Sequence, residues 1–312
     1  MRNLPTHLRD RLQFSGHETF PLRQLWLKKA YDEVNAVEKG SKASVFSDES
    51  AIARFGVGKN MVASIRHWAL ACDVITDDTD DGFEPTKLGK LFFSRNGLDP
   101  YIERPGTPWL MHWMLAGRGY RSTTWFWVFN NVNAGSFRRD VLKAELLKVA
   151  VDSGKKRISA STIDTDINVC IRCYLPALGA SNDEDVIEPL LAELGLLSSH
   201  ARDIFEFRRG PKSTLPDGTF AFALADYWSR WNVENESTQK TLSFDAIAHD
   251  FGSPGRVFKL DENSVAERLI RIDDATNGHF RWSDSAGVRQ VVRTDDALGE
   301  SAMHGYLRAT YE

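Results

Sequence analysis

The closely spaced helical patterns in the first quarter of the chain constrain its fold most. LRQLWLKKAYDEV (residues 22–34) repeats its apolar residues at helical spacing, and SDESAIARF (residues 47–55) predicts a short second helix. Gly56 and Gly58 then turn the chain into a longer helix, which is followed by the acidic loop DDTDDG and by FEPTKLGKLFF. Short helix, glycine turn, longer helix and β-hairpin are the parts of a winged helix-turn-helix.

The longer helix lies in GVGKNMVASIRHWALACDVI and carries the first candidate contact residues. On a wheel of 100° per residue, Met61, Ile65 and Trp68 share one apolar face that is expected to pack inward. The opposite face is expected to be exposed, so that its cations contact phosphates and its amide reaches base edges. The candidate DNA-binding residues on this face are Lys59, Asn60, Arg66 and His67.

A similar order of helix, helix and hairpin recurs further along the chain. FRRDVLKAELLKVAVDSG predicts a helix ending near Gly154, and ISASTIDTDINVCIRCYL predicts a helix that begins on a hydroxyl cap. Asp164 and Asp166 flank the outward side of this second helix, where carboxylates are expected to repel phosphates. The remaining candidate DNA-binding residues belong to this helix and to the basic run before it: Lys155, Lys156, Arg157, Ser161 and Thr165.

The rest of the chain completes the expected architecture. Residues 99–131 are dense in Trp and Phe and predict a buried helical pair, while LSFDAIAHDFGSPGRVFKLDENSVAERLIRI leads to candidate strands at GHFRWSD and GVRQVVR. We therefore expect a mainly α fold with short β-hairpins, in which tandem winged-helix-like units surround a Trp-rich helical centre. The expected division is an N-terminal winged-helix-like domain (1–98), the Trp-rich helical core (99–135), a second winged-helix-like domain (136–236) and a small C-terminal α+β unit (237–312).

Charge is distributed unevenly along the 312 residues. Residues 1–180 carry 25 Lys and Arg against 20 Asp and Glu, whereas residues 181–312 carry 14 against 23, and the whole chain has a net charge of −4. The negative net charge therefore disfavours non-specific binding along nucleic acid. Residues 1–180, with their excess of cations, are better suited to bind a polyanion than residues 181–312. Three cysteines in apolar patterns, with no signal peptide or long apolar window, predict a cytoplasmic protein that does not contact a membrane.

Enzyme motifs are incomplete in this sequence. A P-loop would need Gly at position 53 and Ser or Thr at position 60, where Ala53 and Asn60 stand, and Pro21 occupies the place of the second histidine of H-E-x-x-H. Cys170 and Cys173 form C-x-x-C on a predicted helix without a second ligand pair, which favours core thiols. A tight loop tied by His17 or Glu18 is the favoured interpretation of FSGHETF, and no catalytic residue, metal site or cofactor is expected.

Ordered blocks along nearly the whole chain resemble one known family. FSGHETFPLRQLWLKKAYD, FGVGKNMVASIRHWAL, FEPTKLGKLFF, TTWFWVFN, LAELGLLS and GSPGRVFKLDE are similar to successive blocks of the domain of unknown function 4007 family. The resemblance implies a bacterial protein encoded beside a phosphoadenosine phosphosulfate reductase-like enzyme in DNA phosphorothioation or phage-defence (antiviral defence) clusters. It supplies no catalytic residues, because the family is named for lacking a known activity.

Three functional hypotheses follow from these observations. The first is a non-catalytic subunit that binds double-stranded DNA, or acts as an adaptor, together with the sulfur-transfer enzyme. The second is a scaffold that contacts only proteins, since winged helices also serve as docking modules and fold alone does not settle function. The third is a divergent nuclease or hydrolase, for which no paired carboxylates with a lysine are evident.

Overall fold

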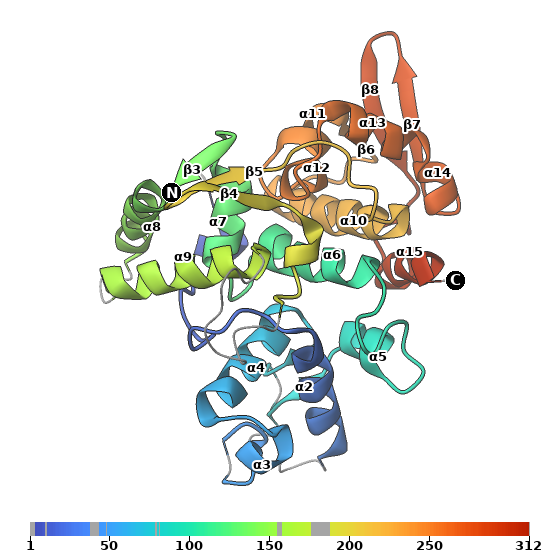
Figure 1. Cartoon of the computed structure of the whole chain (residues 1–312). Helices are drawn as coiled ribbons and strands as arrows, with labels where there is room; N and C mark the ends of the chain where they lie inside the picture. The colour runs from blue at the N-terminus through green and yellow to red at the C-terminus, as the bar shows by residue number, and fades with distance from the viewer. Residues whose placement is uncertain are drawn as a thin grey trace.

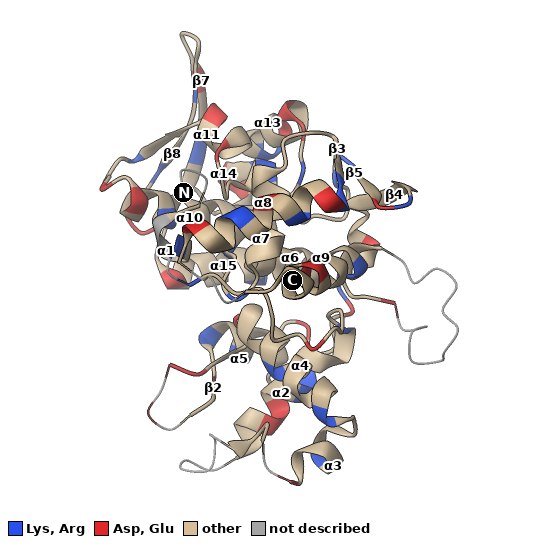
Figure 2. Cartoon of the chain, turned by 90° about the vertical axis from the view of Figure 1, so that its left-hand side faces the viewer, with Lys and Arg blue, Asp and Glu red and all other residues tan. Residues whose placement is uncertain are grey.

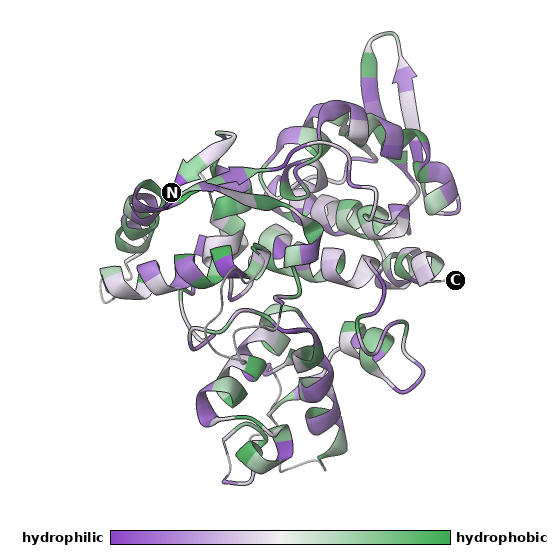
Figure 3. Cartoon of the chain, viewed as in Figure 1, coloured by the Kyte–Doolittle hydropathy of each residue, from purple (hydrophilic) through white to green (hydrophobic). Residues whose placement is uncertain are grey.

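The computed structural model describes residues 4–9, 11–37, 44–47, 49–78, 80, 82–154, 158–175 and 188–311. Within this part of the chain the fold is mainly helical and contains small antiparallel sheets, as the sequence predicts. Most helices are amphipathic, and Figure 3 shows hydrophobic and hydrophilic residues alternating along them. None of the described helices is both long and apolar enough to cross a membrane.

The described residues between 24 and 93 form what we call the N-terminal lobe, which stands below the rest of the molecule in Figure 1. Its helices pack mainly on one another, and β1 pairs antiparallel with β2, with Ile75 opposite Pro85. Gly56 ends the short helix with φ 65°, a left-handed conformation that glycine adopts without steric cost. The elements of the lobe are α2 (Gln24–Ala36), α3 (Ala51–Phe55), α4 (Lys59–Ala71), β1 (Ile75–Thr76), β2 (Glu84–Pro85) and α5 (Lys87–Phe93).

The remaining elements form what we call the body, and their core is the predicted Trp-rich helical pair. Trp109, Trp113 and Trp125 are fully buried here, which confirms a structural role for these aromatic residues. The helices of this centre are α6 (Gly106–His112), the π-helix η2 (Trp113–Arg118) and α7 (Thr123–Asn131). The short helix α1 (Thr6–Arg9) lies near α10 (Asp217–Glu234), so residues 4–9 belong to the body although they precede the lobe in sequence.

Two three-stranded sheets in the body share one topology. In each sheet the first strand pairs with the last, giving the orders β3-β5-β4 and β6-β8-β7. The first sheet and its helices are β3 (Ser136–Arg138), α8 (Arg139–Asp152), α9 (Ala160–Tyr174), η4 (Ala192–Leu194), β4 (Leu197–Ala201) and β5 (Ile204–Phe207). The second set is β6 (Thr241–Ser243), α11 (Phe244–His249), α12 (Pro254–Val257), α13 (Glu262–Ile270), α14 (Ile272–Ala275), β7 (Phe280–Ser285), β8 (Val288–Arg293) and α15 (Glu300–Tyr311).

Several predicted elements are confirmed by this arrangement. FRRDVLKAELLKVAVDSG contains α8, and the GHFRWSD and GVRQVVR segments form β7 and β8, which project as a hairpin at the top of Figure 1. The description of residues 1–98 and 136–236 as winged-helix-like domains, and the four-part division of the chain, stay predictions.

Candidate nucleic-acid interface

Helix α4 presents a narrow polar surface to solvent. Lys59, Asn60 and Arg66 are exposed, as predicted, while Ala63 and Leu70 between and beyond them are half-buried. Lys59, Ala63, Arg66 and Leu70 follow one another at helical spacing, so they form one line along the helix. We call Lys59, Asn60, Ala63 and Arg66 the α4 stripe.

The prediction for His67 is wrong, because this side chain is only 5% exposed. Its ring contacts the rings of His17 and Trp68, with centroid distances of 5.7 and 5.1 Å, and Gln13 Nε2 lies 3.4 Å from its Nδ1. Burial lowers the pKa of His67 well below its usual value, so the ring is neutral. The wheel places His67 on the outer face of an isolated helix, but the loop before α2 covers that side.

Helix α9 carries a second polar line, and it begins on the predicted hydroxyl cap. The Ser159 hydroxyl accepts a hydrogen bond from the Thr162 backbone N–H at 3.1 Å. Ser161 and Thr165 are exposed, as predicted, and Asn168 and Arg172 continue the same line at helical spacing. We call Ser161, Thr165, Asn168 and Arg172 the α9 stripe. The other predicted contact residues, Lys155, Lys156 and Arg157, lie outside the described residues.

The two aspartates expected to repel phosphates on α9 are held by other side chains. Asp166 is buried and accepts hydrogen bonds from His17 Nε2 at 2.7 Å and from the Thr124 hydroxyl at 2.5 Å. Asp164 is half-buried and lies 3.3 Å from Arg139 and 3.5 Å from Lys143. The prediction that Asp166 repels phosphates is therefore wrong, because its carboxylate points away from the stripe. Asp164 lies closer to the stripe, but two cations balance its charge.

The loop FSGHETF (residues 14–20) contacts both α4 and α9. Thr19 N–H lies 3.3 Å from His17 Nδ1, so Nδ1 accepts and the proton of a neutral ring is on Nε2, which donates to Asp166. Gly16, Glu18 and Thr19 have positive φ values of 117°, 47° and 71°. The tight loop tied by His17 is thus confirmed, and its long-range contact with Asp166 is a feature that the sequence did not reveal.

Side chains of α4 and α9 hold this loop against both helices. Trp68 Nε1 on α4 donates to the Phe20 carbonyl at 3.2 Å, and Arg172 on α9 donates to the Thr19 carbonyl at 3.2 Å. The loop therefore links the helix that carries one stripe with the helix that carries the other. Strained backbone of this kind persists only where surrounding contacts determine it.

Cations and carboxylates are interspersed around these helices, as Figure 2 shows for α4, α8 and the β3–β5 sheet. A hollow of about 540 Å³ lies beside the N-terminal half of α9, and most of its lining residues are charged. It is lined by Arg138, Arg139, Asp140, Lys143, Asp164, Arg202, Asp203 and Ile204, a set with four cations and three carboxylates. Asp77 in the acidic loop after β1 is also paired, at 2.7 Å from Arg121.

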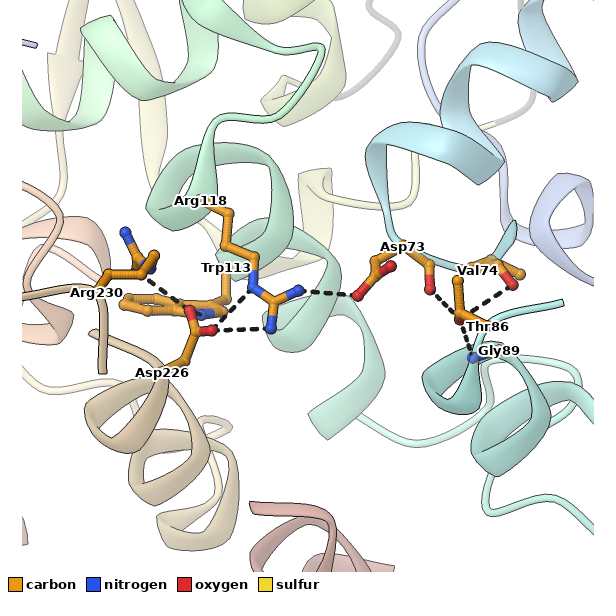
Figure 4. A network of polar contacts seen from close by, with 8 residues as sticks. All are labelled: Asp73, Val74, Thr86, Gly89, Trp113, Arg118, Asp226 and Arg230. Atoms are coloured by element: carbon orange, nitrogen blue, oxygen red, sulfur yellow. Dashed lines mark hydrogen bonds and ion pairs between the residues drawn. The ribbon is translucent and has the colours of Figure 1, made fainter. Parts of the chain in front are cut away.

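A polar joint links the lobe to the body on the other side of α4 (Figure 4). Arg118 in η2 donates to Asp73, just after α4, at 2.8 Å and to Asp226 in α10 at 3.0 Å. Trp113 and Arg230 donate to the second oxygen of Asp226, at 2.9 and 3.2 Å. These cations lower the pKa of Asp226 to about 2 although burial opposes ionisation. Asp73 and Asp226 lie 45 and 108 positions away from Arg118 in the sequence, and no sequence pattern predicts that the three meet.

The cysteines do not form a reactive pair in this structure. Cys170 and Cys173 are fully buried, and burial raises the pKa of Cys173 to about 12, so the thiol stays protonated. Within the described ranges, no group of three or more His, Cys, Asp or Glu side chains is gathered in a way that would hold a metal ion. That observation leaves open a Mg²⁺ ion held by one or two carboxylates and water.

The fold defines a mainly α protein in which a helical lobe stands on a larger body with two three-stranded sheets. The chain belongs to the family described as "Protein of unknown function (DUF4007)", whose profile matches residues 14–311.

Two crystal structures of SspB are similar to this chain over most of its length. The structure described as magnesium ion-bound SspB is 27% identical, with a TM-score of 0.82 over 96% of this chain and 88% of that chain. The other SspB structure is 26% identical, with a TM-score of 0.83 over 98% of this chain and 90% of that chain. A search of curated protein sequences gives no match.

Proposed function

We propose that this chain is a non-catalytic DNA-binding or adaptor component of a bacterial DNA-modification or phage-defence system. The observation that carries the proposal is the pair of exposed stripes on α4 and α9, which contain hydroxyls, amides and cations but no carboxylate. Such side chains hydrogen-bond to phosphates and base edges, which is the contact chemistry of DNA-binding helices. Three nearby carboxylates are paired: Asp166 with His17, Asp164 with Arg139 and Lys143, and Asp77 with Arg121. Glu18 and Asp78 are exposed and would oppose binding.

The topology supports an interpretation as winged-helix units. In the lobe, α2, α3 and α4 precede the β1–β2 hairpin, and in the body α8 and α9 stand between β3 and the β4–β5 hairpin. In a helix-turn-helix protein the last helix before the hairpin enters the major groove. By this correspondence α4 and α9 are the helices that would contact DNA, and the stripes are their outer surfaces.

The proposed protein partner is a phosphoadenosine phosphosulfate reductase-like enzyme encoded nearby. This part of the proposal rests on the family resemblance alone. Co-purification of the two proteins tests it. If the enzyme binds equally well to a variant with altered stripes, the stripes are not the docking surface for the enzyme.

A titration of labelled duplex DNA at two salt concentrations tests the proposed DNA binding. We expect moderate affinity that falls as salt rises, because only a few cations lie on the stripes and their phosphate contacts release counterions. The absence of binding even at low salt would contradict DNA binding and favour the alternative, a protein-only scaffold.

A divergent, divalent-cation-dependent nuclease or hydrolase is the second candidate function. It is favoured by one observation, the magnesium ion named for the similar SspB structure. Incubation of supercoiled plasmid with the protein and Mg²⁺ or Mn²⁺ separates the two functions. The non-catalytic proposal expects intact plasmid, whereas cleavage that co-purifies with the protein and is lost on substitution of one carboxylate would replace it.

A further inference from the structure

The lobe and the body meet through apolar contacts, which belong to one shared hydrophobic core, and through polar contacts between charged side chains. The chain crosses between them twice, through residues 13–23 and 94–105, and the helices of the lobe pack mainly on one another. The apolar contacts include the ring pairs Trp68–Trp125 and Phe92–Tyr311. Ion pairs between the two parts are Asp73 with Arg118, Asp77 with Arg121, and Lys87 with Glu300.

Arg118 is the most buried cation of these three pairs, and its two carboxylate partners differ in accessibility. Asp226 belongs to the body, its side chain is 9% exposed, and it accepts four hydrogen bonds or ion-pair contacts from Arg118, Trp113 and Arg230. Asp73 belongs to the lobe and its side chain is 43% exposed. The bond from Arg118 to Asp226 is therefore the fixed half of the joint, and the bond to Asp73 is the half that can open.

Asp73 is rigidly coupled to the helix and the hairpin of the lobe. It follows the C-terminus of α4 with φ 57°, and its carbonyl accepts a hydrogen bond from the Thr86 hydroxyl at 2.5 Å. The same hydroxyl caps α5 by accepting from the Gly89 N–H at 2.8 Å, as Figure 4 shows. A displacement of Asp73 relative to Arg118 would consequently move α4, the hairpin and α5 together.

We infer that the Asp73–Arg118 pair is a latch that sets the angle between the α4 stripe and the α9 stripe. Asp73 is thus a positioning residue: it contacts no ligand, but it aligns two contact surfaces that would engage one duplex. This last step rests on the proposed DNA binding, whereas the latch itself does not. Prior alignment of two contact surfaces strengthens binding because less freedom is lost on association.

Spin labels on the lobe and the body of the full chain test the latch directly. Ile52 on α3 and Val151 on α8 are 49% and 57% exposed, while Cys72, Cys170 and Cys173 are buried. Ile52→Cys and Val151→Cys therefore accept the labels selectively, and double electron–electron resonance gives the distribution of distances between them. In the parent we expect one narrow distribution.

Asp73→Asn removes the charge but keeps a residue that tolerates the left-handed turn. We expect the distance distribution to broaden or to shift. The change should be partial, because the ion pairs of Asp77 and Lys87 still join the lobe to the body. Asp73→Gly removes the same charge without backbone strain and serves if the first variant folds poorly. The matched control is Glu33→Gln, because Glu33 pairs with Arg54 inside the lobe.

The outcomes separate the latch from the proposed function. If both Asp73 variants keep the parent distribution, the latch is refuted even if the protein binds DNA. If the distribution broadens and the parent also binds duplex, Asp73→Asn should weaken binding about three- to tenfold, and Glu33→Gln should not. If the distribution broadens but the parent binds no DNA, the latch stands and the proposed DNA binding fails.

Discussion

Trp68 has two roles at the scale of a single residue. Its indole is completely buried at the junction of the lobe with the body, where it contacts Trp125, and its N–H donates to the Phe20 carbonyl of the FSGHETF loop. The helical wheel predicted only the first role, because the position of Trp68 in α4 is a local property. The hydrogen bond joins residues 48 positions apart and depends on tertiary packing.

Trp68→Ala should destabilise the protein by about 3–5 kcal/mol, because it leaves a large cavity and an unpaired carbonyl. Urea unfolding measures this change in the free energy of unfolding. Leu25→Ala on the exposed side of α2 is the control and should cost about 0.5 kcal/mol or less. Equal unfolding free energies for the parent and Trp68→Ala would contradict the assigned burial.

His112 makes the stability depend on pH. Its Nε2 donates to the Val257 carbonyl at 3.0 Å, so Nδ1 accepts from the Tyr174 hydroxyl at 2.7 Å, and burial lowers its pKa to about 3. Between about pH 6.5 and pH 3 the unfolded chain binds a proton here and the folded chain does not. Stability should therefore fall as pH falls through this window, by about 1.4 kcal/mol per pH unit from this group.

The comparison of the parent with His112→Gln isolates that contribution. Other titrating groups are common to both proteins, so the slope of unfolding free energy against pH between pH 5.5 and 4.5 should be shallower in the variant by up to about 1.4 kcal/mol per unit. Denaturant unfolding at several pH values gives both slopes. Identical slopes would show that His112 takes up a proton in the folded protein.

At the scale of elements, periodicity predicted the helices that have one buried face. α4 and α9 each expose a narrow polar line, so their apolar residues recur at helical spacing and their limits follow from Gly58 and Ser159. α10 was harder to recognise. Phe220, Ala221, Phe222, Ala223, Leu224 and Ala225 are all buried, and an apolar run without a polar face does not distinguish a buried helix from a strand.

The outer surfaces of elements are predicted less well than their limits. A helical wheel treats a helix as isolated. It correctly predicts that Lys59 and Arg66 are exposed, but it also predicts that His67 is exposed, although the FSGHETF loop covers this side chain. The wheel likewise places Asp166 beside the polar line of α9. It does not reveal that His17, 149 residues away in sequence, donates a hydrogen bond to the Asp166 carboxylate. Contacts across such separations have no local signature in a single sequence.

At the scale of the whole molecule, two parts of the fold each carry one polar stripe. The α4 stripe lies on the lobe and the α9 stripe on the body, while the FSGHETF loop and the Asp73–Arg118 pair join the two parts (Figures 1 and 4). The exposed cations of the stripes are few, so each should contribute measurably to the salt dependence of binding.

The most direct test of the central claim is a DNA titration with Lys59→Glu combined with Arg66→Glu, at two salt concentrations. A matched control with the same change in charge is Arg281→Glu combined with Arg308→Glu, which replaces two exposed cations outside the stripes. They belong to β7 and α15, two elements on the right-hand side of Figure 1. The account predicts that the α4 variant stays folded, loses most of its affinity and shows a salt slope smaller by about two, whereas the control binds nearly like the parent. An α4 variant that is folded and binds duplex with the affinity and salt slope of the parent would contradict the account.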